Sequence, residues 1–267
     1  MFPVSKVCRI LKINRNKYYY IKKIKNNVKK VTEIEKVVLE IYNRHIGNYG
    51  RRRIKREINI TVSEHTISRI LKKYGLTPKA GRHKVGKNIY TAPGYIFDNK
   101  IKKLGLPVKT NTIWCADMSE FKYRNGKLQA SGIIDITSKV VILETGNSPN
   151  AEFAIQNLEK ALKKMGKPQY YHTDRGSAYT SAKMKDMLNE MHIEHSMSAP
   201  HTPNDNQYIE TFWKSMKTEI GNTKNMTEEQ LTQVIKYYEY YYNCERLHSS
   251  IGYAYPMEYF KNKQLCH

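Results

Sequence analysis

Apolar side chains with helical spacing divide the first 75 residues into short segments. In the last of these segments they follow an i, i+3, i+4, i+7 pattern between a candidate N-cap, Ser63, and a glycine, Gly75. The spacing predicts helices at residues 5–11, 32–45, 49–59 and 63–75. Because the last two are short, are joined by a tight turn and carry polar and cationic residues on the outer face, we expect a helix-turn-helix. A plain helical hairpin is the alternative.

The pattern changes after residue 110, where strands begin. Three adjacent strands with short connections are predicted at residues 112–123, 128–137 and 140–143, which implies an antiparallel meander. Further along, the spacing predicts a helix at 151–165, a strand at 169–174, a helix at 180–191, a strand at 193–197 and helices at 204–220 and 227–243. This order predicts an α/β fold with a mixed sheet and flanking helices.

Positive charge is confined to the first part of the chain. Residues 1–110 carry the whole net charge of +22, with 28 Lys and Arg residues against 6 Asp and Glu residues. Residues 111–267 are neutral, with 18 basic and 18 acidic residues. Lysine-rich codon usage would spread the excess evenly, so the asymmetry indicates a basic region for a polyanion followed by a neutral domain. The expected regions are a basic N-terminal helical segment (1–30), a helix-turn-helix DNA-binding region (31–80), a basic linker (81–110), an α/β core (111–222) and a C-terminal helical extension (223–267).

Composition excludes several other classes of protein. The sequence has no apolar run near the roughly 18 to 20 residues of a membrane span and no apolar stretch typical of a signal peptide, so we expect a cytoplasmic protein with no membrane partner. Its four cysteines lie far apart without a C-x-x-C pair, which argues against a disulfide framework or a structural zinc site. A hydrophobic content of 40% argues against a disordered basic tail.

Three acids of the neutral half stand where chemistry is expected. Asp117 lies within the first predicted strand, Asp174 ends the fourth, and Glu210 lies on a later helix. If the first and fourth strands are neighbours, a helix packed across them brings the three carboxylates together. Carboxylates at close range repel one another unless a cation such as Mg²⁺ neutralises them. The alternative is that they are ordinary N-cap or loop carboxylates.

Several ordered motifs surround these acids. They are Tyr49–Ile54, Trp114–Ser119, His172–Ser181, Asp205–Trp213 and Tyr242–Tyr253, followed by Pro256. Together with the 35 residues between Asp174 and Glu210, this series resembles the D, D, E transposases of bacterial insertion sequences, in particular the OrfB type with a retroviral-integrase-like catalytic core. The resemblance covers nearly the whole chain, but it gives no role to Arg246 and His248 in the last motif.

The resemblance implies a fold and a reaction. The fold is an RNase H-like core of five strands with flanking helices at residues 111–222. The reaction is metal-dependent DNA strand cleavage followed by strand transfer, with Asp117, Asp174 and Glu210 holding two Mg²⁺ ions, for which Mn²⁺ can substitute. The implied partners are double-stranded DNA at element ends and target, an upstream-frame protein or fusion, and further copies of the chain on DNA, in the bacterial cytosol or nucleoid.

Candidate DNA-binding residues lie in both halves of the chain. Lys214 and Lys217 share a helix face with Asn206 and Glu210, which suggests contacts to DNA beside the metal. The helix-turn-helix contributes the cationic and polar candidates Arg51, Arg52, Arg53, His65, Ser68, Arg69, Lys72 and Lys73. Asn206 and His172 are expected to support the site, although His172 is equally well explained as a packed histidine and the two lysines as solvated ones.

The sequence also departs from the family pattern. Ala178 stands where glutamine is common, Ser119 where threonine is usual, and Pro200–Pro203 replaces an approach that commonly contains glycine and asparagine. None of these changes removes a carboxylate. The alternatives to an active transposase are therefore a catalytically impaired DNA-binding regulator or remnant, and an RNase H-like nuclease that cuts without joining.

Overall fold

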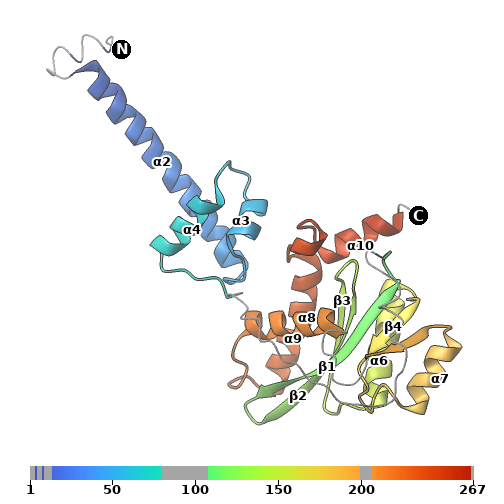
Figure 1. Ribbon diagram of the computed structural model, residues 1–267. Coiled ribbons are helices and arrows are strands. Elements are labelled where there is room, and N and C mark those ends of the chain that lie inside the picture. Colours follow the sequence, from blue (N-terminus) through green and yellow to red (C-terminus); the bar gives the residue numbers. More distant parts are fainter. Residues whose placement is uncertain (1–3, 5–7, 9–13, 80–107, 199–205, 266–267) are drawn as a thin grey trace, which may run out of the picture. The chain divides into compact units, whose positions relative to one another are not determined.

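The computed structural model describes residues 4, 8, 14–79, 108–198 and 206–265 (Figure 1). The chain forms two compact units, Met1–Arg82 and His83–His267. The helix expected at 5–11, nearly all of the linker expected at 81–110, and Pro200–Pro203 lie outside the described residues. Within the described ranges, every helix is too short or too polar to span a bilayer.

The first unit is helical. Its described elements are α2 (Arg15–Arg44), α3 (Arg51–Glu57) and α4 (Glu64–Lys73). Apolar side chains from all three helices form its buried centre, namely Val38, Ile41, Ile54, Ile67, Ile70 and Leu71. Ser63 caps α4 as predicted, because its Oγ accepts a hydrogen bond from the backbone N–H of Thr66 at 3.0 Å. The two short helices of the expected helix-turn-helix are confirmed.

Helix α2 is longer than the sequence pattern indicates. We expected a helix at residues 32–45, but α2 begins at Arg15, where Asn14 accepts a hydrogen bond from the N–H of Asn16. The stretch before residue 32 has apolar residues at helical spacing, Ile21, Ile24, Val28 and Val31, but its many lysines and asparagines are equally typical of a linker. Lysine nevertheless has good helix propensity, and one cap at Asn14 serves the whole helix. The expected boundary at residue 30 therefore falls inside a continuous helix.

The second unit is built on a five-stranded mixed sheet in the order β3-β2-β1-β4-β5 (Figure 1). The meander consists of β1 (Ile113–Tyr123), β2 (Gly126–Asp135) and β3 (Val141–Gly146), paired antiparallel. On the other side of β1, β4 (Tyr170–Thr173) and β5 (Glu194–Met197) run parallel to it. The predicted α/β class, the meander and the pairing of the first and fourth strands are confirmed.

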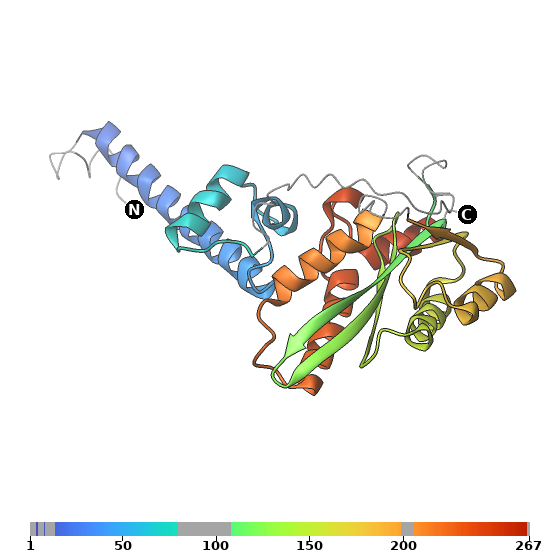
Figure 2. The same cartoon turned by 60° about the horizontal axis from the view of Figure 1, so that its bottom comes forward.

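Helices cover both faces of this sheet (Figures 1 and 2). One face packs against α8 (Gln207–Ile220) and α9 (Glu228–Cys244), and the other against α6 (Ala151–Met165), α7 (Ala182–Glu190) and α10 (Pro256–Leu265). Alternation along β1 follows from the strand period of two, since Cys115 and Phe121 face the α8 side while Trp114 and Ala116 face the α6 side.

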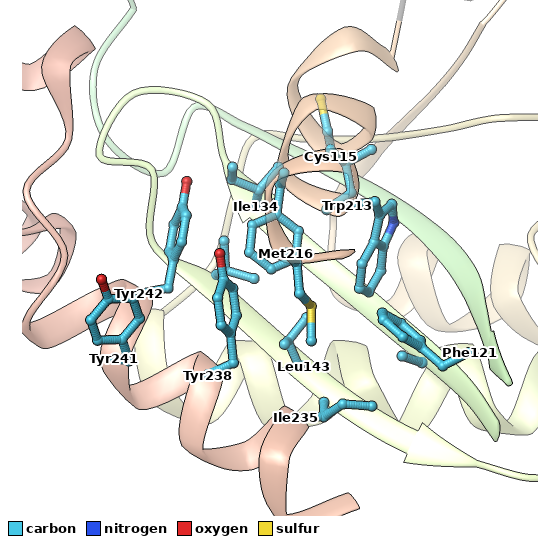
Figure 3. Close-up of a cluster of buried hydrophobic side chains, with 14 of the residues drawn as sticks. Cys115, Phe121, Ile134, Leu143, Trp213, Met216, Ile235, Tyr238, Tyr241 and Tyr242 are labelled. Carbon is cyan, nitrogen blue, oxygen red and sulfur yellow. The ribbon is translucent and has the colours of Figure 1, made fainter. Parts of the chain in front are cut away.

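The α8-side cluster is rich in aromatic and sulfur-containing side chains (Figure 3). Trp213 and Met216 from α8 meet Phe121 from the sheet and Tyr238 and Tyr242 from α9. Because α9 lies beyond residue 222 and shares this cluster, the expected C-terminal extension contributes to the hydrophobic core. A short 3₁₀ helix, η2 (Ser249–Ile251), follows α9 and leads to α10.

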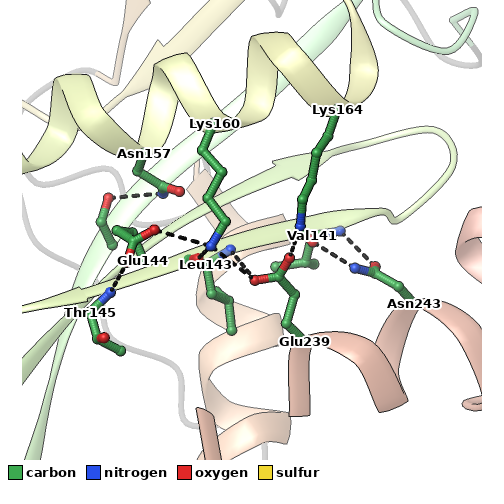
Figure 4. A network of polar contacts seen from close by, with 10 residues as sticks. Val141, Leu143, Glu144, Thr145, Asn157, Lys160, Lys164, Glu239 and Asn243 are labelled. Carbon is green, nitrogen blue, oxygen red and sulfur yellow. Dashed lines mark hydrogen bonds and ion pairs between the residues drawn. The ribbon is translucent and has the colours of Figure 1, made fainter. Parts of the chain in front are cut away.

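Strand β3 is an edge strand whose outer backbone groups are bonded to helix side chains (Figure 4). Asn243 of α9 accepts from the N–H of Val141 at 2.9 Å and donates to its carbonyl at 2.7 Å. Glu239, four residues earlier, accepts from the N–H of Leu143 at 3.1 Å. These contacts cover the groups through which an exposed edge would pair with another chain.

Candidate active site

Asp117 and Asp174 are set beside each other by the parallel pairing of β1 and β4. The last paired residues are Cys115 and His172, so continuing that register places Asp174 at the level of Asp117. Asp117 lies on the same face of β1 as Cys115, which is the face covered by α8. Asp174 directly follows β4, at the end of the strand, and its carboxylate is exposed.

The turn after β4 fixes the Asp174 side chain. Its Oδ1 accepts a hydrogen bond from the N–H of Gly176 at 2.9 Å. A Cβ at position 176 would stand 3.0 Å from the same oxygen, so a side chain there would crowd the carboxylate. The glycine of this motif therefore leaves room for the carboxylate and also supplies it with a donor.

Glu210 lies in the first turn of α8 and is exposed. Two contacts next to Asp117 hold α8 against the sheet. Asn206, which precedes the helix, donates from Nδ2 to the carbonyl of Ala116 at 3.1 Å. Trp213 packs over Gly132, which pairs directly with Asp117 across β1 and β2. These contacts bring the glutamate helix to the carboxylate-bearing strand.

The electrostatics of Asp117 reflect these neighbours. The pKa of Asp117 is raised to about 7, mainly by burial and further by the charges of Asp174 and Glu210, while a backbone hydrogen bond at Met118 opposes the rise. Burial also raises the pKa of Glu210. The site therefore has an excess of negative charge and oxygen donors only. In the described part of the chain, no three acidic, histidine or cysteine side chains already stand as a complete ligand set for a metal ion.

Comparisons with known proteins agree with this geometry. Residues 107–203 and residues 191–256 match two family models, each described as an integrase core domain. The chain is 28% identical over 229 residues to the transposase for insertion sequence element IS904 of Lactococcus lactis, covering 83% of this chain and 90% of that one. It is 28% identical over 278 residues to transposase InsF for insertion sequence IS3A of Escherichia coli, covering 99% and 96%.

The chain belongs to the insertion-sequence transposases with an integrase core domain. A chain of the simian T-cell lymphotropic virus intasome superposes with a TM-score of 0.53 at 17% sequence identity, over 84% of this chain and 74% of that chain. This likeness confirms the RNase H-like fold expected for the core.

The two candidate lysines of α8 differ in their surroundings. Lys217 places Nζ 5.2 Å from the centre of the Phe121 ring, and its charge lowers the pKa of Asp117. Lys214 is exposed on the same helix, one turn closer to Glu210. Of the two, Lys217 is the one that the structure brings into electrostatic contact with the transposase carboxylates.

His172 is placed inside the sheet. It is fully buried, and its ring nitrogens lie 3.0 Å from Ser196 Oγ and 3.0 Å from Ser198 Oγ. Arg175, next to Asp174, donates from Nε to the carbonyl of Ser198 at 3.1 Å. These contacts connect the end of β4 to β5 and its following residue. They favour the interpretation of His172 as a packed histidine, and they stabilise the chain on either side of Asp174.

The candidate DNA-binding residues of the helix-turn-helix differ in their surroundings. Arg51, Ser68 and Lys72 line one hollow of about 350 Å³, together with Thr77 and Pro78. His65 and Arg69 are exposed. The Nε atoms of Arg51 and Arg52 lie 3.2 Å and 3.9 Å from the Glu64 carboxylate. The guanidinium of Arg53 lies 5.6 Å from the centre of the Tyr49 ring.

Lys73 is in a different position from the other cations of α4. Its Nζ lies 2.8 Å from Glu35 Oε1 on α2, and the hydroxyl of Tyr74 donates to the other oxygen at 3.2 Å. The hydrogen bond from Lys73 lowers the pKa of Glu35. Lys73 is therefore exposed but already paired with a carboxylate of α2.

Sequence reasoning missed the roles of three residues that contact the acids or the helix that carries Glu210. The role of Gly132 could not be predicted, because nothing in the sequence indicates that a tryptophan packs against this strand glycine. Tyr179 belongs to a quoted motif but was given no role, and it is buried where the charges of Asp117 and Asp174 help to raise its pKa. Arg246 also belongs to a motif and was given no role, and its side chain is buried against Glu219 of α8.

Proposed function

We propose that this transposase cuts a DNA strand to expose a 3′-hydroxyl and joins it to a target strand, with Asp117, Asp174 and Glu210 as the catalytic carboxylates. The observation that carries this proposal is the convergence of the three acids, because the pairing of β1 with β4 and the bond from Asn206 to Ala116 bring them together. Burial, and after it the charges of the other two acids, raises the pKa of Asp117. A surface loop or N-cap carboxylate does not need such neighbours. The alternative of three unrelated acids is therefore less well supported.

The residues fit a divalent cation. The donors are oxygens only, and the raised pKa of Asp117 reflects burial together with the negative charges of Asp174 and Glu210, which a divalent cation would balance. Asp174 and Glu210 are exposed at the ends of a strand and a helix, so an ion can reach their carboxylates from solvent. A pair of Mg²⁺ ions, or Mn²⁺ in their place, would activate the attacking oxygen and stabilise the leaving one. Asn206, Lys217 and the turn at Gly176 orient the carboxylates and the DNA phosphate.

We propose that the hollow of the helical unit is a binding site for the DNA backbone. Arg51 and Lys72 supply two cations, and Ser68 and Thr77 supply hydroxyls around an apolar floor that includes Leu71. Such a set favours a phosphate group over a base edge. Lys73 has the opposite role in this proposal, since its pairing with Glu35 stabilises the unit.

The catalytic proposal is tested by strand transfer with labelled element-end DNA, the upstream-frame protein and Mg²⁺ or Mn²⁺. Asp174→Asn and Glu210→Gln should abolish both nicking and joining while DNA binding persists. Asp186→Asn, an exposed aspartate on α7, is the matched control and should retain activity. If Asp174→Asn joins ends as well as the parent, the assignment is wrong. Cutting without joining by the parent would favour a nuclease, and binding without either would favour an impaired regulator.

The partners follow from the same proposal. We expect the transposase to act as an oligomer on the paired DNA ends and to need the protein encoded by the upstream frame, either separately or as a fusion. Gel filtration with and without end DNA tests the first expectation. Comparing strand transfer with and without the upstream protein tests the second.

A further inference from the structure

Arg246 and Glu219 form a buried ion pair between the tail of the core and the helix that carries Glu210. Arg246 Nη2 lies 2.6 Å from Glu219 Oε1, and Nε lies 3.1 Å and 3.0 Å from the two carboxylate oxygens. The hydroxyl of Tyr238 donates to Oε2 at 2.9 Å. Glu219 is 3% exposed and Arg246 4% exposed, so this network is shielded from water.

We propose that Arg246 is a positioning residue for strand transfer: through Glu219 it fixes the register of α8 and thereby the place of Glu210 against Asp117. This inference rests on the proposed role of Glu210. It gives a function to the arginine of the last sequence motif, to which the resemblance assigned none.

The chemistry of the pair favours positioning over simple stabilisation. Desolvating two charges offsets most of their attraction, so buried ion pairs are often no more stable than apolar residues of the same volume. A guanidinium that reaches both oxygens of a carboxylate does, however, define distance and orientation. The ring of Tyr242, 5.1 Å from the guanidinium, limits its movement on one side.

Helix α8 is held by polar contacts at both ends. Asn206 bonds to Ala116 at the first end, beside Asp117, and Glu219 bonds to Arg246 at the other. Between them the helix rests on the sheet mainly through apolar side chains, as Trp213 and Met216 show in Figure 3. Trp213 fits closely over Gly132, but apolar contact is otherwise less directional than a hydrogen bond or an ion pair. The two polar ends therefore add direction to this packing and help to set where Glu210, which lies between them, is directed.

The alternative is that the pair matters only for folding. In that case activity would follow the folded fraction of each variant, and an apolar replacement that restores stability would restore activity as well. Positioning makes a different prediction, because an apolar pair can fill the space without fixing the register of the helix.

The test uses the full chain with its DNA and metal ion and compares Glu219→Leu/Arg246→Met with Arg246→Lys. The exposed pair Glu152 and Lys183, which links α6 to α7 on the other face, provides the matched control Glu152→Leu/Lys183→Met. For Glu219→Leu/Arg246→Met we expect a melting temperature close to that of the parent, a kcat lower by about 10- to 100-fold and a KM for DNA changed less than twofold. Arg246→Lys keeps the charge but loses the fork, so its kcat should lie in between.

The activity of the variants and hydrogen exchange in α8 together decide the proposal. A lower kcat in a stable double variant, with faster hydrogen exchange at residues 207–220, supports it. Full kcat in that variant, or a kcat that only follows the folded fraction, overturns it. If the double variant does not fold, the kcat and KM of Arg246→Lys decide in the same way. If the parent itself transfers no strand, the proposed function fails, and hydrogen exchange in α8 still reports whether the pair holds this helix.

Discussion

Replacing Gly132 by alanine should separate the stability of the core from its activity. Gly132 pairs with Asp117 across the sheet, and an added Cβ would stand 2.6 Å from Cζ2 and 3.0 Å from Cη2 of Trp213. It would also stand 3.3 Å from Cδ1 of Ile209, the residue before Glu210. The clash therefore falls on the helix turn that carries Glu210, the proposed catalytic glutamate.

The size of the effect follows from these distances. Carbon atoms prefer a separation of about 3.5 to 4.0 Å, so α8 has to move outward by roughly 1 Å. Trp213 cannot rotate away freely, because its ring is buried and packs against Phe121 and Phe212. Overpacking of this kind costs about 1 to 3 kcal/mol, which corresponds to a melting temperature lower by roughly 3 to 10 °C. A 1 Å displacement of a catalytic group can lower the rate by about 100-fold.

Gly146→Ala provides a control with the same clash in a different place. Its Cβ would stand 2.9 Å from the ring of Phe153, on α6, which carries none of the three carboxylates. We expect both variants to lose similar stability in thermal unfolding, but only Gly132→Ala to lose strand transfer when both are assayed well below their melting temperatures. Adding Trp213→Phe to Gly132→Ala should recover part of the activity. Equal losses of activity in the two glycine variants would refute the reasoning.

Three further predictions concern pH, the sheet edge and DNA. Because the pKa of Asp117 is raised to about 7 in the fold, its contribution to the stability of the metal-free protein is full below its unfolded value of 3.8 and is lost as pH rises through 7. In EDTA, urea unfolding at pH 5 and pH 8 should show the part of this loss that falls above pH 5, at most about 3 kcal/mol, in the parent but not in Asp117→Asn; identical pH profiles would contradict it. Asn243→Ala leaves two backbone groups of Val141 unpaired and should cost about 1 to 3 kcal/mol and increase aggregation, while Cys244→Ala, the exposed neighbour, should change neither. Lys72→Ala should weaken DNA binding and lower the slope of log K against log salt by about 0.9, with no change in unfolding, and an unchanged slope would remove Lys72 from the interface.

The sequence pattern located the sheet well because its signals are local. Alternation of apolar residues, turns and capping residues predicted β1 to within one residue and α6 at its observed ends. It missed the first half of α2, where Ile21, Ile24, Val28 and Val31 do have helical spacing but stand among many lysines and asparagines. Composition that is typical of a linker therefore obscured a helical pattern that was present.

The site shows the same limit at longer range. Asp117, Asp174 and Glu210 could be named in advance because each stands in a recognisable motif. The contacts that hold them depend on pairs far apart in the chain, such as Asn206 with Ala116.

Neither member of such a long-range pair is informative alone. In the sequence, Arg246 is one of many cations, and its role becomes clear only from its ion pair with Glu219 on α8. Gly132 is an unfavourable residue for a strand, and its role becomes clear only because Trp213 packs over it. A transposase sequence with three intact carboxylates can therefore still be inactive if one of these contacts is lost. Judging whether a copy of such an element is still functional requires inspection of the α8 contacts as well as the triad.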